Sequence, residues 1–347
     1  MYIKKLLWII SILGLLVVGS FSYYIYDVMF SPNTSFQNKE AFIFISSDAN
    51  FETIKNDLEP LLIDIGSFET LAKQKKYDVN IKPGRFRLTS GMTNNDIINA
   101  LRNGNLPVRV SFNNQNSLEL LAGRIAFQIE ADSLSLLLAF QDPTILSKYN
   151  LNADTALSLF LPNTYEFFWN TDASAFVERM ALEYDKFWTL ERRDQASKLG
   201  LSPTEVVILA AIVQEESKKN VEQPRIAGVY LNRLNNGWPL QADPTVKFAI
   251  YQQPAWDGIP VKRILNKHLE IDSPYNTYKN RGLPPAVIAM PDIAAIKSVL
   301  NAESHSYFYF SADPEKPGFH NFAKTLAQHN KNAQRYHNYL NRIGASR

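Results

Sequence analysis

The sequence predicts an α+β protein with three parts: an N-terminal transmembrane helix, a small α+β module and a larger mixed α+β domain. An uncharged apolar stretch at 6–26 follows two lysines, short strands alternate with capped helices from residue 41, and a helix after residue 202 is apolar on every side. The chain has 347 residues, of which 46% are hydrophobic and 20% charged, so it is long enough for two or three folded units.

Composition excludes several classes of function. The formal net charge of +2 gives no argument for a nucleic-acid partner. The absence of cysteine excludes disulfides, thiolate chemistry and cysteine metal sites. The five histidines show no close metal-ligand spacing, and neither a serine nucleophile elbow nor a phosphate-binding glycine loop is present. We therefore expect no metal and no cofactor, which leaves acid/base chemistry by carboxylates.

The N-terminus predicts a membrane anchor. Residues 6–26 carry no charged side chain and are long enough to cross a hydrocarbon core of roughly 30 Å as a helix. The lysine-bearing residues 1–5 should stay in the cytoplasm, and Asp27 ends the apolar run. A cleaved signal peptide is the alternative, but the stretch is long for one and its cleavage pattern is poor. We expect a single-pass protein of the plasma (inner) membrane, with a tether at 27–40 and the rest on the periplasmic side.

The small module covers residues 41–110 and the larger domain 111–347. In the module, short elements alternate: a strand at 41–46, a helix at 51–62, a strand at 85–88, a helix opened by Thr93 and stopped at Gly104, and a strand at 108–112. The larger domain begins with a mostly helical region at 117–198, interrupted at 161–165. Its last elements are strand-like segments at 307–310 and 319–322 and a helix at 325–343.

The helix after residue 202 carries the first candidate for catalysis. Ser202 as N-cap and Glu205 three residues later form a capping box, so the start of the helix is well defined. Because every side chain at 206–213 is apolar, the helix should lie inside a core and bring Glu215 and Glu216 to the edge of that core. Burial disfavours the charged form of a carboxyl group, so either glutamate could be a proton donor near neutral pH.

The residues alone do not choose between the two glutamates. Both share a stripe with apolar residues of the helix. In the alternative interpretation, neither is catalytic, and both are solvated or paired with Lys218 and Lys219.

Three polar, turn-rich segments after a helix at 224–234 suggest the wall of a cleft. They lie at 240–246, 272–278 and 282–285, and they offer amides, hydroxyls and aromatic rings, which suit a sugar. Turn capping is an equal alternative for Asn276, Thr277 and Tyr278. For His320, a packed structural histidine is the alternative to an acid or base.

These segments together resemble the YceG-like family of membrane-anchored endolytic murein (peptidoglycan) transglycosylases. The matching stretches are Leu209–Glu216, Val229–Leu234, Leu240–Val246, Ser273–Tyr278, Gly282–Pro285, His320–Phe322, Thr325–Leu326 and His329–Asn330. The family's catalytic glutamate falls on Glu216. Gln214 stands where the family commonly has a glutamate, and Asn163 stands where it has an aspartate.

The resemblance implies cleavage of the MurNAc–GlcNAc bond within glycan strands, leaving 1,6-anhydro-MurNAc ends, with Glu216 as general acid and then general base. It also implies that the small module is LysM-like and that glycan strands, and peptidoglycan synthases, are partners. The residues expected to contact the substrate are Asn232, Gln241, Asp243, Tyr275, Asn276, Thr277, Tyr278, His320 and Phe322. The alternative function is a non-catalytic murein-binding scaffold for a synthase.

Overall fold

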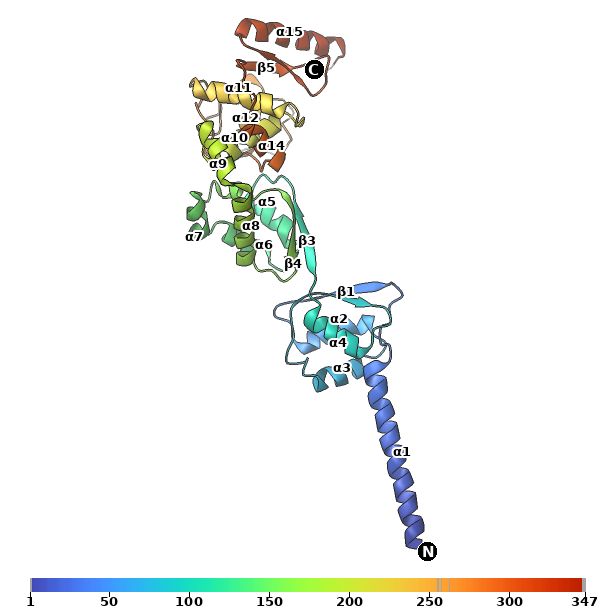
Figure 1. Ribbon diagram of the computed structural model, residues 1–347. Coiled ribbons are helices and arrows are strands. Elements are labelled where there is room, and N and C mark those ends of the chain that lie inside the picture. Colours follow the sequence, from blue (N-terminus) through green and yellow to red (C-terminus); the bar gives the residue numbers. More distant parts are fainter. Residues whose placement is uncertain (1, 255, 257, 262, 345–347) are drawn as a thin grey trace. The chain divides into compact units, whose positions relative to one another are not determined.

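The computed structural model in Figure 1 describes residues 2–254, 256, 258–261 and 263–344. Residue 1 of the predicted cytoplasmic end and residues 345–347 of the predicted larger domain lie outside the described residues. The chain divides into two compact units. Unit 1 comprises Met1–Val110, Phe127–Ala131 and Tyr165–Asp172, and unit 2 comprises Ser111–Ala126, Asp132–Thr164 and Ala173–Arg347. Both contain helices and strands, as the α+β prediction requires.

The N-terminal apolar helix is longer than expected. Helix α1 (Tyr2–Phe30) begins before residue 6 and continues past Asp27, whose carboxylate accepts a hydrogen bond from the Ser31 hydroxyl at 2.5 Å. Among the described residues, α1 is the single unbroken helix that is long and apolar enough to cross a membrane. The bent pair α9 (Leu190–Lys198) and α10 (Pro203–Glu216) passes the same test of length and composition, but α10 is buried inside unit 2.

Unit 1 is built on one antiparallel pair of strands covered by helices. Strand β1 (Glu40–Ile45) pairs with β2 (Gly84–Thr89), with Glu40 opposite Thr89. The helical elements are α2 (Phe51–Leu58), the 3-10 turn η1 (Glu59–Leu61), α3 (Ile65–Gln74) and α4 (Asn94–Asn103). Their apolar faces share one core with the strands, whose most buried members include Ile45, Ile54, Phe68, Phe86 and Ile97.

Local capping explains the helix boundaries of unit 1. Helix α4 begins at the predicted Thr93, which forms a capping box with Asp96. Its C-cap is Gly104, whose backbone N–H donates to the Ala100 carbonyl, and a Cβ at this position would lie only 2.7 Å from the same oxygen, so glycine is favoured there. Helix α3 was not predicted, although Asp64 caps it by accepting hydrogen bonds from the backbone N–H groups of Gly66 and Ser67.

The predicted interruption at 161–165 of the helical region is a strand. Strand β4 (Asn163–Phe168) pairs with β3 (Pro107–Phe112), and the boundary between the two units falls within both strands. The other elements of this region in unit 2 are helical: α5 (Leu118–Ala126), α6 (Ser133–Phe140), α7 (Pro143–Leu146), η2 (Ser147–Tyr149), η3 (Ala156–Leu159), α8 (Ala173–Phe187) and α9.

Helix α10 is the central helix of unit 2. Its capping box of Ser202 and Glu205 is present as predicted, and every side chain from Val206 to Gln214 is buried. It packs against α11 (Gln223–Asn235), α12 (Asp243–Tyr251) and α14 (Ile293–Leu300); a short helix, α13 (Asn266–Leu269), contacts α12. Helix α14 was not predicted. The expectation of a loop through 240–246 was wrong, because Asp243 starts α12 and Pro244 occupies its first turn, where proline is favourable.

The C-terminal part of unit 2 is a hairpin covered by a helix. Strand β5 (Tyr309–Ala312) starts two residues later than predicted and pairs with β6 (His320–Ala323). Helix α15 (Leu326–Arg342), capped by the predicted Thr325, packs against both strands (Figure 1). This hairpin and α15 form one side of the cavity described next.

Candidate active site

A cavity of about 290 Å³ in unit 2 brings together side chains that are far apart in the sequence. The end of α10, helix α11, the start of α12, strand β5 and helix α15 all contribute to it. Four predicted site residues line it. They are Glu216, Gln241, Asp243 and Tyr278. Five further residues complete the lining: Arg233, Tyr309, Phe310, Leu326 and His329.

Glu216 is the last residue of α10 and has the environment of an acid/base group. The buried Tyr230 hydroxyl donates a hydrogen bond of 2.7 Å to its Oε1 atom. Burial raises the pKa of Glu216 to about 7, and the negative charge of Asp243 acts in the same direction. The hydrogen bond from Tyr230 and the positive charges at His320 and Arg233 lower the pKa and so oppose this shift. A carboxyl group with this pKa exists in both protonation states at neutral pH.

Glu215, one position earlier, is in a different environment. Its side chain is 37% exposed and forms an ion pair of 2.7 Å with Lys218. It lines a separate, smaller cavity beside Pro244 and Phe248. The two glutamates, between which the sequence did not choose, therefore have different environments. Glu215 is an exposed, ion-paired surface residue, whereas Glu216 lines the cavity and accepts a hydrogen bond from Tyr230.

A second carboxylate, Asp243, lines the same cavity. The Tyr278 hydroxyl donates a hydrogen bond of 2.7 Å to Asp243 Oδ1, and burial raises the pKa of Tyr278 above its ordinary value, so this hydroxyl stays protonated. Gln241 reaches the cavity from a left-handed backbone conformation (φ 51°), and its backbone N–H donates to the Thr277 carbonyl at 3.0 Å. Amide, hydroxyl and carboxylate groups thus surround Glu216.

Residues 43–335 match the family model described as the YceG-like family. The chain belongs to this family. An endolytic murein transglycosylase of Bacillus subtilis (strain 168) is 28% identical over 269 residues, covering 73% of this chain and 72% of the relative. One of Streptococcus pneumoniae (strain ATCC BAA-255 / R6) is 27% identical over 351 residues, covering 92% of this chain but only 62% of that longer relative. The crystal structure of a yceG-like protein from Listeria monocytogenes aligns with a TM-score of 0.55 and 27% identity, covering 84% of this chain and 98% of that one.

In this YceG-like protein, Asn276 and Thr277, two of the predicted contact residues, make hydrogen bonds that hold the loops together. The Asn276 side chain is fully buried and donates at 2.8 Å to the carbonyl oxygens of Leu269 and Ile271. The buried Thr277 hydroxyl accepts a hydrogen bond of 3.0 Å from the Ala242 backbone N–H. These contacts agree with turn capping, the alternative that the sequence left open.

Asn232 likewise holds the chain near the hairpin, because its side-chain amide donates at 2.9 Å to the carbonyl oxygens of His305 and Tyr307. Tyr275 packs on Phe248 with ring centroids 4.7 Å apart. Neither side chain lines the cavity of Glu216.

His320 and Phe322 lie on β6, next to the cavity wall. The Nδ1 atom of His320 is 2.8 Å from Glu222 Oε2, and its ring makes a T-shaped contact with Phe310, which does line the cavity. Phe322 packs against Phe310 with a centroid distance of 6.0 Å. Both residues support the wall through Phe310, and their predicted contact with substrate stays a prediction.

Six residues of the site were missed as site residues by sequence reasoning: Tyr230, Arg233, Tyr309, Phe310, Leu326 and His329. The first two lie on α11, in the motif that carries Asn232, so the motif could have pointed to them. Arg233 is buried and donates through Nε to the Phe308 carbonyl at 2.8 Å and through Nη1 to the Leu240 carbonyl. The His329 ring stacks on Tyr309, and burial lowers the pKa of His329, so the imidazole is neutral at pH 7.

Gln214, which departs from the commoner glutamate of the family, has a structural role. Its Oε1 atom accepts a hydrogen bond of 2.7 Å from the backbone N–H of Asp292, the residue that precedes α14. An uncharged amide is well suited to this buried position. Among the described residues, no group of three or more histidines or carboxylates lies close enough together to hold a metal ion.

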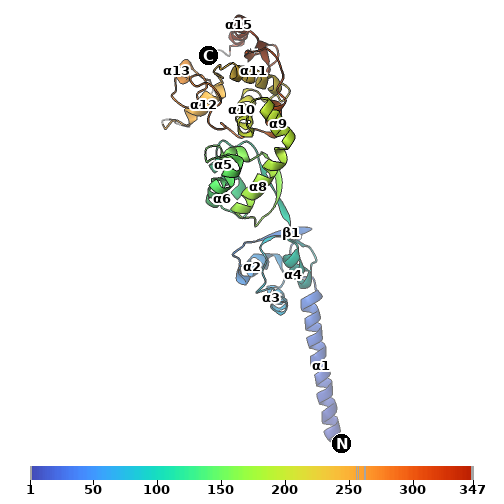
Figure 2. The same ribbon diagram turned by 60° about the vertical axis from the view of Figure 1, so that its left-hand side comes forward.

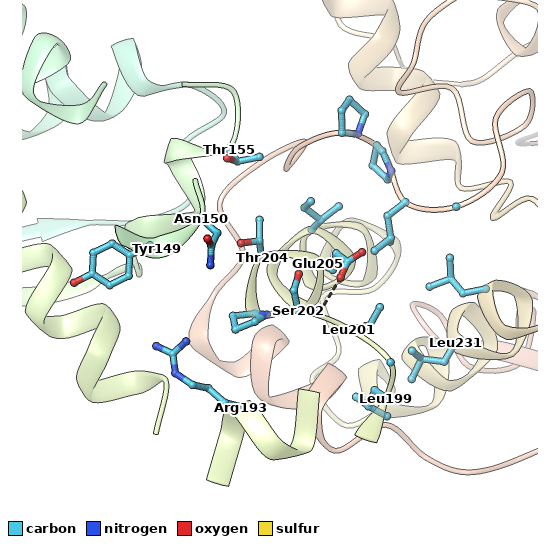
Figure 3. Close-up of a pocket in the computed structure, with 18 of the residues that line it drawn as sticks. Tyr149, Asn150, Thr155, Arg193, Leu199, Leu201, Ser202, Thr204, Glu205 and Leu231 are labelled. Carbon is cyan, nitrogen blue, oxygen red and sulfur yellow. Dashed lines mark hydrogen bonds between the residues drawn. The ribbon is translucent and has the colours of Figure 1, made fainter. Parts of the chain in front are cut away.

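A larger cavity, of about 780 Å³, lies at the other end of α10 (Figure 3). Tyr149, Asn150, Thr155 and Arg193 line it, together with the first turn of α10. Its Glu205 carboxylate accepts the Ser202 backbone N–H at 2.8 Å as part of the capping box. Because α10 has 14 residues, about 20 Å of helix separates this cavity from Glu216.

Proposed function

We propose that this protein is a membrane-anchored endolytic murein transglycosylase that cleaves the MurNAc–GlcNAc bond within glycan strands. The observation that carries the proposal is Glu216, a carboxyl group with a pKa of about 7 in a cavity lined by hydrogen-bonding and aromatic side chains. The names of the relatives support the same activity. The role of Glu216 and the contact residues are our inference from geometry.

In the proposed reaction, protonated Glu216 donates its proton to the glycosidic oxygen, and the bond from that oxygen to C1 of MurNAc breaks. The C6 hydroxyl of the same MurNAc attacks C1, forming the 1,6-anhydro ring. The Glu216 carboxylate then takes the hydroxyl proton, which restores the acid. No water is consumed. A pKa near the working pH suits a group that must serve both as acid and as base.

The sugar would be held by three of the predicted residues and by two aromatic rings. Gln241, Asp243 and Tyr278 offer hydrogen bonds to its hydroxyl and acetamido groups, while Tyr309 and Phe310 offer aromatic surface for apolar contact with the sugar. The hydrogen bonds of Asn232, Asn276 and Thr277 support a different role for these residues: they shape the loops from which the contact residues project.

The anchor and the small module complete the proposal. Helix α1 would cross the inner membrane with residues 1–5 in the cytoplasm, so that unit 2 and the part of unit 1 that follows α1 would lie on the periplasmic side. Unit 1, which has its own apolar core, would be the LysM-like module that helps to hold glycan strands. This topology would place cleavage near the membrane, where strands are made, and a peptidoglycan synthase would be a partner; crosslinking through α1 tests that partnership.

The decisive experiment compares Glu216→Gln with Glu215→Gln on purified sacculi, with mass spectrometry of the released fragments. We expect wild-type enzyme to create 1,6-anhydromuramyl ends and Glu216→Gln to lose activity by about 10²-fold or more, as for removal of a general acid. Glu215→Gln should keep most of the activity because that residue faces Lys218 and solvent.

Equal loss in both variants, or full activity of Glu216→Gln, would refute the assignment. Reducing ends instead of anhydro ends would indicate hydrolysis. Binding of strands without any new ends would favour the alternative of a non-catalytic scaffold for a synthase.

A further inference from the structure

The end of α1 is joined by buried contacts to the rest of unit 1, the unit to which this helix belongs. Val28, in the last turns of α1, is 5% exposed, and its carbonyl accepts a hydrogen bond of 2.9 Å from the buried side chain of Asn94 on α4. Asn94 also accepts a hydrogen bond of 2.6 Å from Asn33, which lies in the segment expected to be a tether. Helix α1 packs against both α3 and α4. The direction in which α1 leaves is therefore fixed relative to unit 1.

The turns of α1 that meet unit 1 carry the aromatic side chains typical of a membrane–water interface. Tyr23, Tyr24, Tyr26 and Phe30 are between 49% and 71% exposed, and together with Phe21 they follow a stretch at 9–20 that contains no aromatic residue. Tyrosine is enriched at the level of lipid headgroups in transmembrane helices. If α1 spans the bilayer as proposed above, the contact between α1 and α3 lies at that level.

Helix α3 and the residues flanking it carry exposed lysines and exposed apolar side chains, and the carboxylates of α3 and its N-cap, Glu69 and Asp64, lie near its start and middle. Segment 73–82 contains four lysines and one acidic residue, Asp78. Lys76 and Lys82 are exposed, and within the described part of the chain their side-chain amines have no hydrogen-bond or ion-pair partner. Two large apolar side chains flank α3, Ile63 at 69% exposure and Val79 at 74%.

Two other lysines of the segment have partners. Lys73 pairs with Glu69 at 2.6 Å, and Lys75 donates to Asn95. In both views, α3 lies at the end of unit 1 from which α1 leaves, and β1 lies at the opposite end (Figures 1 and 2). Exposed lysines next to exposed aliphatic side chains are the combination that binds the interface of an anionic bilayer.

We propose that this surface, formed by Ile63, Lys73, Lys76, Val79 and Lys82 and called here the α3 surface, rests on anionic phospholipid headgroups of the leaflet from which α1 emerges. The inference rests on the proposed membrane anchor. With one fixed helix and one bound surface, unit 1 would be held upright at the bilayer, whereas an anchor through a free tether would let it tumble.

The absence of cysteine from the chain makes a direct test possible. Full-length Val79→Cys, and Asp48→Cys as the control in the turn after β1, are labelled with an environment-sensitive fluorophore. Each is reconstituted in vesicles of phosphatidylglycerol and phosphatidylcholine that contain a headgroup nitroxide lipid. We expect several-fold stronger quenching, and bluer emission, at position 79 than at position 48. Adding Lys76→Glu and Lys82→Glu, or omitting phosphatidylglycerol, should remove most of that difference.

The outcomes separate the inference from the anchor on which it rests. Release of the chain from vesicles by an alkaline wash would refute the membrane anchor itself. A chain that stays in the vesicles but is quenched equally at positions 79 and 48 would overturn the α3 surface alone. Strong quenching at 79 that survives both the lysine substitutions and the neutral lipid would overturn recognition of anionic headgroups.

Discussion

The environment of Glu216 predicts that removing its charge stabilises the protein at neutral and alkaline pH. In the folded chain its pKa is about 7, above the ordinary value of 4.5. Between these two values the folded state binds the proton and the unfolded state does not, so the free energy of unfolding falls as pH rises through this range. Glu216→Gln has no proton to lose there, and its carbonyl oxygen can still accept the hydrogen bond from Tyr230.

The size of the effect follows from the same two values. At ~1.4 kcal/mol per pKa unit, the difference corresponds to about 3 kcal/mol, and because the Glu216 side chain is partly exposed in the cavity we expect about 2 kcal/mol. For a domain of this size, that raises Tm by about 4–8 °C. The gain should be complete above pH 7 and small near pH 4.5, where Glu216 is protonated in the folded state and half protonated in the unfolded state.

Thermal unfolding of the full chain in detergent, at a series of pH values, measures this difference directly. Glu215→Gln is the matched control, since Glu215 is exposed and paired with Lys218, and its curve should run parallel to that of wild type. If the Tm of Glu216→Gln also runs parallel to wild type from pH 4.5 to pH 8, Glu216 has no raised pKa and the proposed acid/base role loses its physical basis.

Three further substitutions probe the same cavity and the loops that carry it. Tyr230→Phe removes a hydrogen bond that favours the charged form of Glu216, so the pKa of Glu216 should rise. The alkaline limb of the pH–rate profile for glycan cleavage should therefore move up by about 1 pH unit. The control is Tyr184→Phe, which removes a hydroxyl with no link to Glu216 and should leave the limb in place. Asp243→Asn removes a negative charge that raises the pKa of Glu216, so the limb should move down, and an upward shift would contradict this electrostatic account. Asn276→Ala removes two buried hydrogen bonds and should lower the free energy of unfolding by about 1–3 kcal/mol in denaturant titrations. An unchanged unfolding midpoint would mean that these hydrogen bonds do not stabilise the loop.

Features decided by nearby residues could be predicted from the sequence. The start of α10 depends on Ser202 and Glu205 alone, and its burial follows from an unbroken apolar run, so both predictions are confirmed. The same kind of signal was present for α3, where Asp64 caps an apolar periodicity, and it was overlooked. At α12, Pro244 was interpreted as a turn residue, although proline is equally suited to a first helical turn.

Features decided by distant residues could not be predicted. Glu215 and Glu216 are neighbours on one helix end, and what separates them is Tyr230, which α11 brings to only one of the two. Asn276 has the composition expected of a sugar contact and of a turn cap alike, and its burial beneath Leu269 and Ile271 carbonyls becomes visible only when the loop is folded. Such choices depend on packing between elements, which a single sequence does not contain.

The second carboxylate beside Glu216, Asp243, bears on the choice between transglycosylation and hydrolysis. Intramolecular attack needs a single catalytic carboxylate, whereas an ordinary glycosidase uses two, and the folded cavity contains both Glu216 and Asp243. Asp243 accepts a hydrogen bond from Tyr278, and its negative charge would stabilise the positive charge that develops at C1 in either reaction. A hydrolase that used Asp243 as base or nucleophile would stop in Asp243→Asn. A transglycosylase would continue more slowly and still release 1,6-anhydromuramyl ends, because the attacking hydroxyl belongs to the substrate and returns its proton to Glu216.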